Sequence, residues 1–199
     1  MAKKLEFFYD CSSPWTYLAF TKIEDVAARH RADLIWKPIL VGGVFNAVNP
    51  SVYESRTNPV KPKARYYQKD LQDWAHYYGI KIGSPTVFPV NSVKAMRGAF
   101  VALEHGLISR YSRRIFERYW GDDADISKDD VMRAIVREVG LDEKEFFEKI
   151  NSQSYKDKLR VNTEELIERG GFGSPTIFVD GVMFFGNDRL ELVEWELSK

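Results

Sequence analysis

The sequence predicts an α/β fold in which a βαβ unit and a ββα unit flank an all-helical insertion. Strand-like segments occur near the N-terminus and again near the C-terminus. The stretch between them, residues 63–171, carries helical periodicity and few strand signals. The two strand-bearing ends are therefore expected to form one α/β domain, into which the helices are inserted.

The N-terminal segments predict the βαβ unit. Leu5–Tyr9 is apolar and aromatic, as a buried strand is. A helix is expected over Pro14–His30, with Ser13 as its N-cap and a proline as its first residue. Asp33–Pro38 predicts a second short strand. Two strands joined by a helix in this way are expected to be parallel, with a right-handed connection.

The middle of the chain predicts a loop and then a series of helices. The segment Gly42–Lys63 is expected to be a long loop bordering the site. One later helix should open with Ser127 as its N-cap and acidic residues in its first turn. Glycines fall where the helices should stop. The other expected helices are Arg65–Tyr78, Val93–His105, Ser109–Trp120, Asp142–Ile150 and Ser154–Arg169.

The C-terminal segments predict the ββα unit. Thr176–Val179 and Val182–Phe185 are β-prone, and Asp180–Gly181 between them is a hairpin turn signal. Leu190–Leu197 predicts a last helix. The expected domains are thus a discontinuous α/β domain, residues 1–62 and 172–199, and a helical insertion domain, residues 63–171.

Composition excludes several classes of protein. The 29 basic residues balance the 29 acidic ones, which argues against a nucleic-acid binder. One cysteine among 199 residues rules out an internal disulfide and a cysteine-based zinc site, and we expect no metal. No leader-like segment and no apolar run of about 20 residues occurs. We expect a soluble, cytoplasmic protein without membrane partners.

Two features make the predicted sheet thioredoxin-like. Ser174–Pro175 directly precedes a strand, where such folds hold a cis-proline beside the start of the first helix. Ser13-Pro14-Trp15-Thr16 stands where those folds carry a C-x-x-C motif. Serine therefore occupies the position of the attacking cysteine, and threonine that of the resolving one.

Four separated segments resemble one family. FYDCSSPWTYLAF, FPVNSVKAMR, GFGSPTIFV and FFGNDRLEL are similar to segments of 2-hydroxychromene-2-carboxylate isomerases and their relatives, the kappa-class glutathione transferases. The segments occur in the family's order and the resemblance covers nearly the whole chain. It implies a DsbA-like, thioredoxin-superfamily fold with a helical insertion, which agrees with the pattern of elements above.

The resemblance also implies glutathione as cofactor and a set of residues that bind it. Ser13 matches the family serine that contacts the glutathione sulfur. A hydroxyl hydrogen bond and the positive end of a helix both favour a thiolate. Ser174 would offer its backbone to the glutathione cysteine as an added strand does. The γ-glutamyl end would be gripped by the Gly186-Asn187-Asp188 stretch, although Asp188 could instead be only an N-cap.

The remaining candidates concern the substrate and the cysteine. Asn58 is a candidate contact by resemblance, although the spacing of SRTNPVKPK departs from the family pattern. Trp15 and Phe88 could line an aromatic substrate or be core residues, as could Phe45 and Trp36. Cys11, which has no second cysteine to pair with, is interpreted as a small, semi-buried residue at the end of a strand.

Several functions fit these features. The leading one is a glutathione-dependent isomerase of 2-hydroxychromene-2-carboxylate or a related intermediate in the bacterial breakdown of aromatic compounds. The resemblance also implies a homodimer, the usual state of the family. The first alternative is a kappa-like glutathione transferase or peroxidase. A thiol–disulfide oxidoreductase is disfavoured by the missing C-x-x-C motif. The last alternative is a thioredoxin-fold binding module without catalytic activity, which would not need glutathione.

Overall fold

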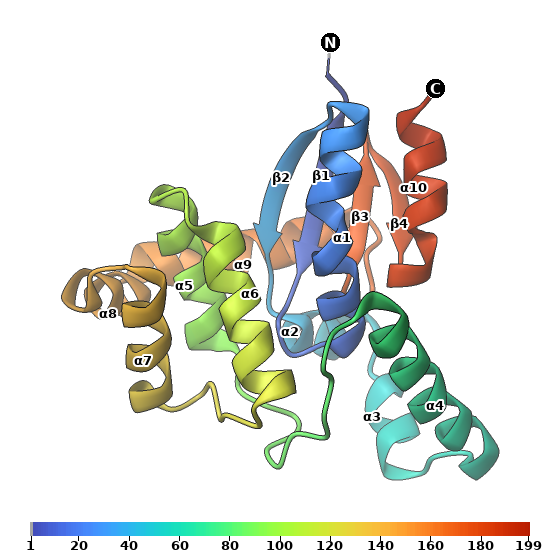
Figure 1. Cartoon of the computed structure of the whole chain (residues 1–199), viewed down its shortest axis with the longest axis horizontal. Coiled ribbons are helices and arrows are strands. Elements are labelled where there is room, and N and C mark those ends of the chain that lie inside the picture. Colours follow the sequence, from blue (N-terminus) through green and yellow to red (C-terminus); the bar gives the residue numbers. More distant parts are fainter. Residues whose placement is uncertain (1) are drawn as a thin grey trace.

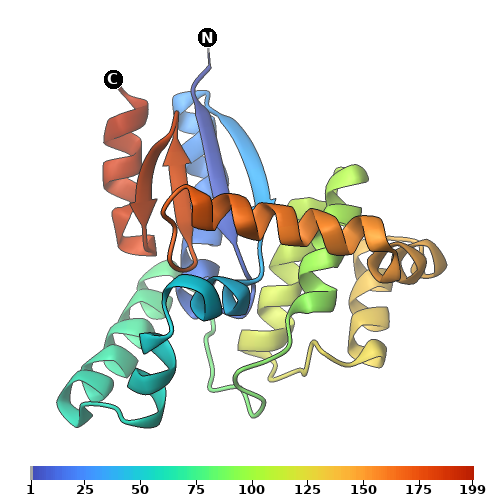
Figure 2. The same cartoon turned by 180° about the vertical axis from the view of Figure 1, so that it is seen from behind.

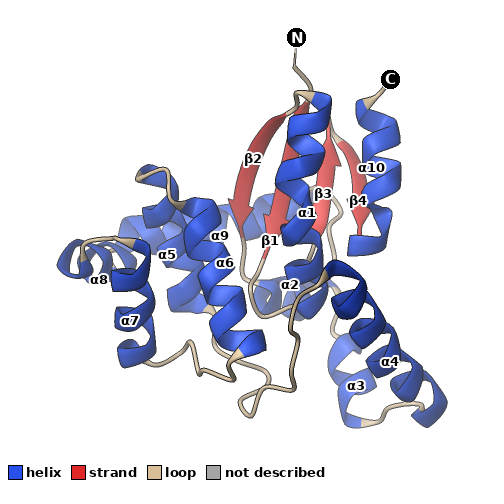
Figure 3. Ribbon diagram, in the orientation of Figure 1, coloured by secondary structure: helices blue, strands red, loops and turns tan. Residues whose placement is uncertain are grey.

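The computed structural model describes residues 2–199 and shows one four-stranded mixed sheet (Figures 1 and 3). The strands are β1 (Lys4–Tyr9), β2 (Asp33–Pro38), β3 (Thr176–Val179) and β4 (Val182–Phe185), in the order β2-β1-β3-β4. Strand β1 runs parallel to β2 and antiparallel to β3, so the two ends of the chain meet at the centre of the sheet. The predicted βαβ–ββα order is confirmed.

Helices cover both faces of the sheet. Helices α1 (Pro14–His30) and α10 (Leu190–Leu197) pack together on one face (Figure 1). Helix α9 (Gln153–Glu168) crosses the opposite face, with α2 (Val41–Val48) beside it (Figure 2). The others form a pair and a side bundle: α3 (Ser51–Thr57), α4 (Lys61–Tyr78), α5 (Val93–Glu104), α6 (Ile108–Phe116), α7 (Asp129–Val139) and α8 (Glu143–Asn151).

The alternation of side chains along β1 explains the two layers. Phe7 points to the α1 face, where its ring packs edge-on against Trp36 at 5.7 Å between centroids. Phe8 points the other way, onto Phe178, and both are buried beneath α9. A six-residue strand with large side chains on both faces can thus hold two helical layers together.

The segment predicted as a loop is the main error of the sequence reading. Gly42–Lys63 contains α2 and α3 and the first turn of α4. Helix α2 has two glycines and three valines, a composition with low helix propensity. Tertiary contacts stabilise this helix instead, because Val44 is fully buried and packs in one cluster with Leu166 of α9.

Two helix ends also differ from the prediction. Lys128, rather than Ser127, is the N-cap residue of α7, and the Ser127 hydroxyl donates to Asp125 at 2.6 Å. The helix expected to reach Trp120 ends its α-helical part at Phe116 and continues as a π-helical turn, Glu117–Gly121. Short polar side chains that bind local groups compete with capping, which is why the Ser127 signal misled.

The helical block lies between β2 and β3, as predicted. Its core is continuous with that of the sheet, since Phe116 of α6 stacks on Tyr17 of α1 at 4.9 Å between ring centroids. The division at residues 63–171 therefore stays a prediction. Within residues 2–199, no helix combines the length and the apolar character needed to cross a bilayer.

Candidate active site

Ser13 and Ser174 meet at the start of α1. The Ser174–Pro175 peptide is cis, as predicted. The Ser13 hydroxyl donates to the Ser174 carbonyl oxygen at 3.0 Å and accepts from the Thr16 N–H at 3.2 Å. Ser13 is therefore both the N-cap of α1 and a direct neighbour of the cis-proline loop. The pairing of these two serines, 161 positions apart, is the structural core of the site.

A buried hydroxyl pair fixes the loop behind Ser13. The Ser174 Oγ lies 2.8 Å from the Thr16 Oγ1 and accepts from the Asp10 N–H at 3.0 Å. Thr16 is fully buried. It occupies the position of a resolving cysteine, and its hydroxyl serves as a hydrogen-bond partner for the cis-proline loop.

Asp10 is a residue that sequence reasoning missed. Its carboxylate is fully buried and accepts from the N–H groups of Ser12 and Val41, both at 2.9 Å. It also accepts from the Ser92 hydroxyl at 3.0 Å. Burial raises the pKa of Asp10, and these hydrogen bonds oppose that rise. One carboxylate thus ties the end of β1 to α2 and α5, and only its position directly after an apolar strand hinted at this role.

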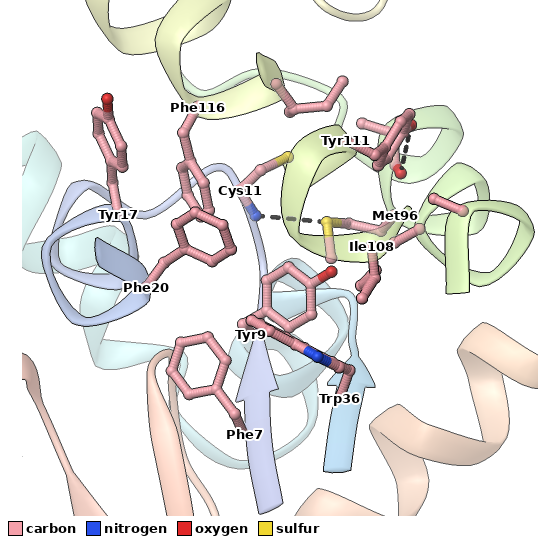
Figure 4. Packing of buried hydrophobic residues seen from close by; sticks show 14 of the residues in the cluster. Phe7, Tyr9, Cys11, Tyr17, Phe20, Trp36, Met96, Ile108, Tyr111 and Phe116 are labelled. Carbon is pink, nitrogen blue, oxygen red and sulfur yellow. Dashed lines mark hydrogen bonds between the residues drawn. The ribbon is translucent and has the colours of Figure 1, made fainter. Parts of the chain in front are cut away.

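Cys11 is a core residue (Figure 4). It is 2% exposed, its N–H donates to the Met96 sulfur at 3.4 Å, and its carbonyl accepts from the Trp120 indole at 2.9 Å. Burial raises the pKa of the Cys11 thiol well above its usual range, and the Asp10 charge adds to this. A protonated, enclosed thiol is a poor nucleophile, so the structure favours the interpretation of Cys11 as a structural residue; its burial is more complete than the semi-buried position expected.

The Gly186-Asn187-Asp188 stretch folds next to the cis-proline. The Gly186 N–H donates to the Pro175 carbonyl at 3.1 Å, and its φ of 107° requires glycine. Asn187 is 3% exposed, and its amide Nδ2 has no hydrogen-bond partner among residues 2–199. Asp188 is about half exposed and pairs with Arg189 at 3.2 Å. A buried amide with unused donors beside an open carboxylate suits a ligand that carries both charges.

Aromatic side chains surround Gly173, directly before the cis-proline loop. Phe172 and Phe185 lie 4.4 Å apart between ring centroids and are each 39% exposed. A Cβ at Gly173 would lie 2.8 Å from the Phe185 ring and 3.8 Å from Phe45. Large apolar side chains remain solvent-accessible here, which is typical of a binding surface.

A second group of aromatic residues faces the α3–α4 pair. The Trp15 indole donates to the Tyr67 hydroxyl, and the two rings pack edge-on at 5.0 Å. The Arg56 guanidinium lies 5.2 Å from the Phe88 ring and 5.6 Å from the Phe45 ring. Phe88 is 47% exposed and Trp15 is half-buried. Sequence reasoning missed Arg56 and Tyr67, since neither stands in a recognisable motif.

Asn58 lies apart from these groups. It is the exposed C-cap residue of α3, and its N–H donates to the Glu54 carbonyl at 2.9 Å. The connection between α3 and α4 that carries it lies at the end of this helical pair away from the sheet (Figure 1). Its role as a substrate or glutathione contact stays a prediction.

Known proteins are similar to this chain over nearly their whole length. A 2-hydroxychromene-2-carboxylate isomerase from Sphingobium xenophagum is 29% identical over 194 residues, which cover 98% of this chain and 97% of the relative. Glutathione S-transferase kappa 1 from Homo sapiens is 29% identical, with 97% and 90% covered. The solved structure of a 2-hydroxychromene-2-carboxylate isomerase superposes with a TM-score of 0.82 at 25% identity, covering 98% of this chain and 94% of that one.

These likenesses confirm the thioredoxin-like fold predicted from the order of strands and helices. The family model of the DSBA-like thioredoxin domain matches residues 4–198. That match spans both ends of the sheet and all the helices between them. The chain belongs to the DSBA-like thioredoxin domain family.

Proposed function

We propose that the chain is a glutathione-dependent isomerase of 2-hydroxychromene-2-carboxylate or a related intermediate of aromatic-compound degradation. The observation that carries the proposal is the Ser13 hydroxyl at the N-terminus of α1, beside the cis Ser174–Pro175 peptide. The only cysteine of the chain is buried, so a nucleophilic sulfur must come from a ligand. Relatives named as isomerases and as glutathione transferases support the isomerase activity and the cofactor.

The reaction needs a sulfur that adds and leaves again. A thiolate adds to the conjugated C=C bond and places the electron pair on the neighbouring carbonyl as an enolate. The former double bond is then single and rotates. Return of the electron pair expels the thiolate and restores the double bond in the other geometry, so that no atoms are gained or lost.

Ser13 would supply the hydrogen bond that keeps this sulfur ionised. Its hydroxyl now donates to the Ser174 carbonyl at 3.0 Å. A glutathione cysteine bound along the cis-proline loop would take up that carbonyl through its own N–H. The Ser13 hydroxyl would then be free to turn to the sulfur, with the positive end of α1 behind it.

The γ-glutamyl end of glutathione would meet matching groups nearby. The γ-glutamyl ammonium would meet the half-exposed Asp188 carboxylate, and its carboxylate would take the unused donors of Asn187. Gly186 lets this turn approach the cis-proline loop closely.

Arg56 is our candidate for holding the substrate carboxylate. A guanidinium held against the faces of Phe45 and Phe88 keeps its N–H donors available to an acid. The same two rings would flank an aromatic substrate. We expect Arg56→Met to raise the KM for a hydroxychromene carboxylate about tenfold while glutathione affinity stays unchanged, because one charge-assisted hydrogen bond is lost.

The test is a turnover screen with and without glutathione. Hydroxychromene carboxylates report isomerisation, and an uncharged electrophilic aryl halide reports the alternative, a kappa-like transferase. Isomerisation that requires glutathione and weakens in Arg56→Met supports the proposal. Turnover of the aryl halide alone, unaffected by Arg56→Met, would support the transferase instead.

A further inference from the structure

A cavity separate from the Ser13 site lies between α2, α5 and α9. Its volume is about 350 Å³, within the range of small-molecule sites. None of the residues assigned above to glutathione or the substrate lines it. Its walls include Leu40, Val93, Leu159 and Ile167, with charged residues of α5 and α9 at its edge.

Arg97 is the least satisfied of these charged residues. It belongs to the FPVNSVKAMR segment, residues 88–97, of which the proposed reaction uses only Phe88. Its Nη1 donates to the Ile150 carbonyl at 3.3 Å, and its Nε is shielded from solvent with no partner among residues 2–199. Burial lowers the pKa of Arg97. A partly buried guanidinium with an unpaired donor would be stabilised by an anionic ligand.

The other charges leave the cavity positive. Lys156 is an exposed lining residue on α9. Arg160 is paired with Glu164 at 2.6 Å, so these two largely cancel. The cavity therefore offers Arg97 and Lys156 to a ligand, together with the apolar walls.

We propose that this cavity is a binding site for a small organic anion that has one carboxylate and an apolar ring. The carboxylate would lie against Arg97 and Lys156, and the ring between Leu40, Val93 and Leu159. The apolar walls disfavour inorganic phosphate, and a volume of about 350 Å³ suits one small molecule rather than a peptide of several residues.

The cavity is also joined to the Ser13 loop. Its lining residues Leu40 and Val93 directly precede and follow Val41 and Ser92, which both donate to the Asp10 carboxylate. Asp10 in turn accepts from the Ser12 N–H, next to Ser13. A ligand in the cavity would therefore contact Leu40 and Val93, the chain neighbours of the two residues that donate to Asp10.

Calorimetric titration with naphthoate and with its uncharged amide, naphthamide, tests the proposal. The protein is kept saturated with glutathione and carries Arg56→Met, so that naphthoate does not use the substrate site proposed above; the variants below are made in this background. We expect naphthoate to bind and naphthamide to bind at least tenfold more weakly, a difference of about 1.4 kcal/mol. Arg97→Met and Lys156→Met should each weaken naphthoate binding at least tenfold. Lys144→Met, at a lysine 86% exposed on α8, should leave it unchanged.

Three results would overturn the proposal: no naphthoate binding, equal binding of the amide, or naphthoate binding unaffected by Lys156→Met. The last of these places the ligand elsewhere, and it does not depend on whether Arg97→Met folds, because Lys156 is exposed. Glutathione-dependent turnover is measured in parallel. Absence of turnover would contradict the proposed function and leave the cavity proposal standing, and absence of naphthoate binding would do the opposite.

Discussion

The Ser13 oxygen has two roles, and substitution separates them. As N-cap it accepts the Thr16 N–H, and in the proposed function it donates to a thiolate. Ser13→Ala should raise the pKa of bound glutathione by about one to two units, since a hydrogen bond to a charged acceptor is worth about 1.5–3 kcal/mol. Loss of the cap should also lower the free energy of unfolding by about 1 kcal/mol.

Ultraviolet absorbance of the thiolate, titrated with pH in the bound complex, measures this shift. The rate at neutral pH should fall and recover in part as the pH rises towards the new thiol pKa. Asp142→Ala is the matched control, because it removes the N-cap hydrogen bond that the Asp142 carboxylate accepts from the Glu145 N–H at α8, away from the residues of the site. Identical titration curves for wild type and Ser13→Ala would make Ser13 a helix cap only.

Cys11 allows the opposite prediction. Cys11→Ala should keep kcat/KM within about threefold, because the chemistry belongs to the sulfur of the ligand. It should lower the free energy of unfolding by about 1 kcal/mol through lost packing next to Met96 and Trp120. Steady-state kinetics and urea unfolding check the two halves separately. A loss of activity beyond tenfold in a folded variant would return Cys11 to the catalytic residues.

Among the elements, α5, α8 and α9 are joined by one carboxylate. Glu104 of α5 accepts from Lys149 of α8 at 2.9 Å and from Tyr155 and Lys158 of α9, both at 2.5 Å. Burial raises its pKa, but these hydrogen bonds outweigh burial and hold the pKa of Glu104 at about 2.

This carboxylate predicts part of the acid sensitivity. Because its pKa is depressed in the folded state, Glu104 stabilises the fold above about pH 4.3, and this contribution is lost as the pH falls towards 2. Glu104→Gln should lower the free energy of unfolding by about 1 kcal/mol at neutral pH and by almost nothing near pH 2. The figure is kept small because the Glu104 side chain is 38% exposed and solvent screens its charge.

Urea unfolding of wild type and Glu104→Gln across this pH range measures the difference. Glu148→Gln serves as control, since its side chain is 68% exposed and lies 4.0 Å from its partner Lys144. A cost of Glu104→Gln that does not change with pH contradicts the assigned ionisation.

Elements with strong local signals were predictable. Pro14–His30 carries an N-cap serine, a first-turn proline and apolar residues near helical spacing, and its predicted bounds match α1. Helix α2 has no such signals: its N-cap is Leu40, without a side-chain hydrogen bond, and two glycines lie in its first turn. Packing against α9 decides its conformation, and packing between distant segments is not visible in local sequence.

Within the candidate site, the residues that belong to a recognisable motif were predictable from the sequence. Ser13 and Ser174 were brought together because the fold itself pairs a first-helix start with a cis-proline. Asp10, Arg56 and Tyr67 were not identified, since their importance arises from contacts across β1, α3 and α4. Such residues become visible only once the elements are placed in space.

Ligand binding should be measurable on the whole molecule. Glutathione at 100 times its dissociation constant should add about 2.7 kcal/mol to the free energy of unfolding and raise the Tm by about 5–10 °C. Cysteinylglycine, which lacks the γ-glutamyl group, should give a smaller shift, as should glutathione with Asp188→Ala. Equal shifts for both ligands would remove Asp188 from the glutathione site. Light scattering of the same samples tests the expected homodimer.

The antiparallel pairing of β1 with β3 has a consequence for biosynthesis. The ribosome releases Ser13 and β1 early, but the strand that pairs with β1 and carries the cis-proline loop emerges only near the end of translation. Until then the nascent chain exposes an unpaired strand edge rich in aromatic side chains, which favours aggregation and chaperone binding. A chain truncated before β3 would therefore lack the cis-proline loop and leave one edge of β1 unpaired. We expect cellular quality control to treat it as an unfolded protein rather than as a less active enzyme.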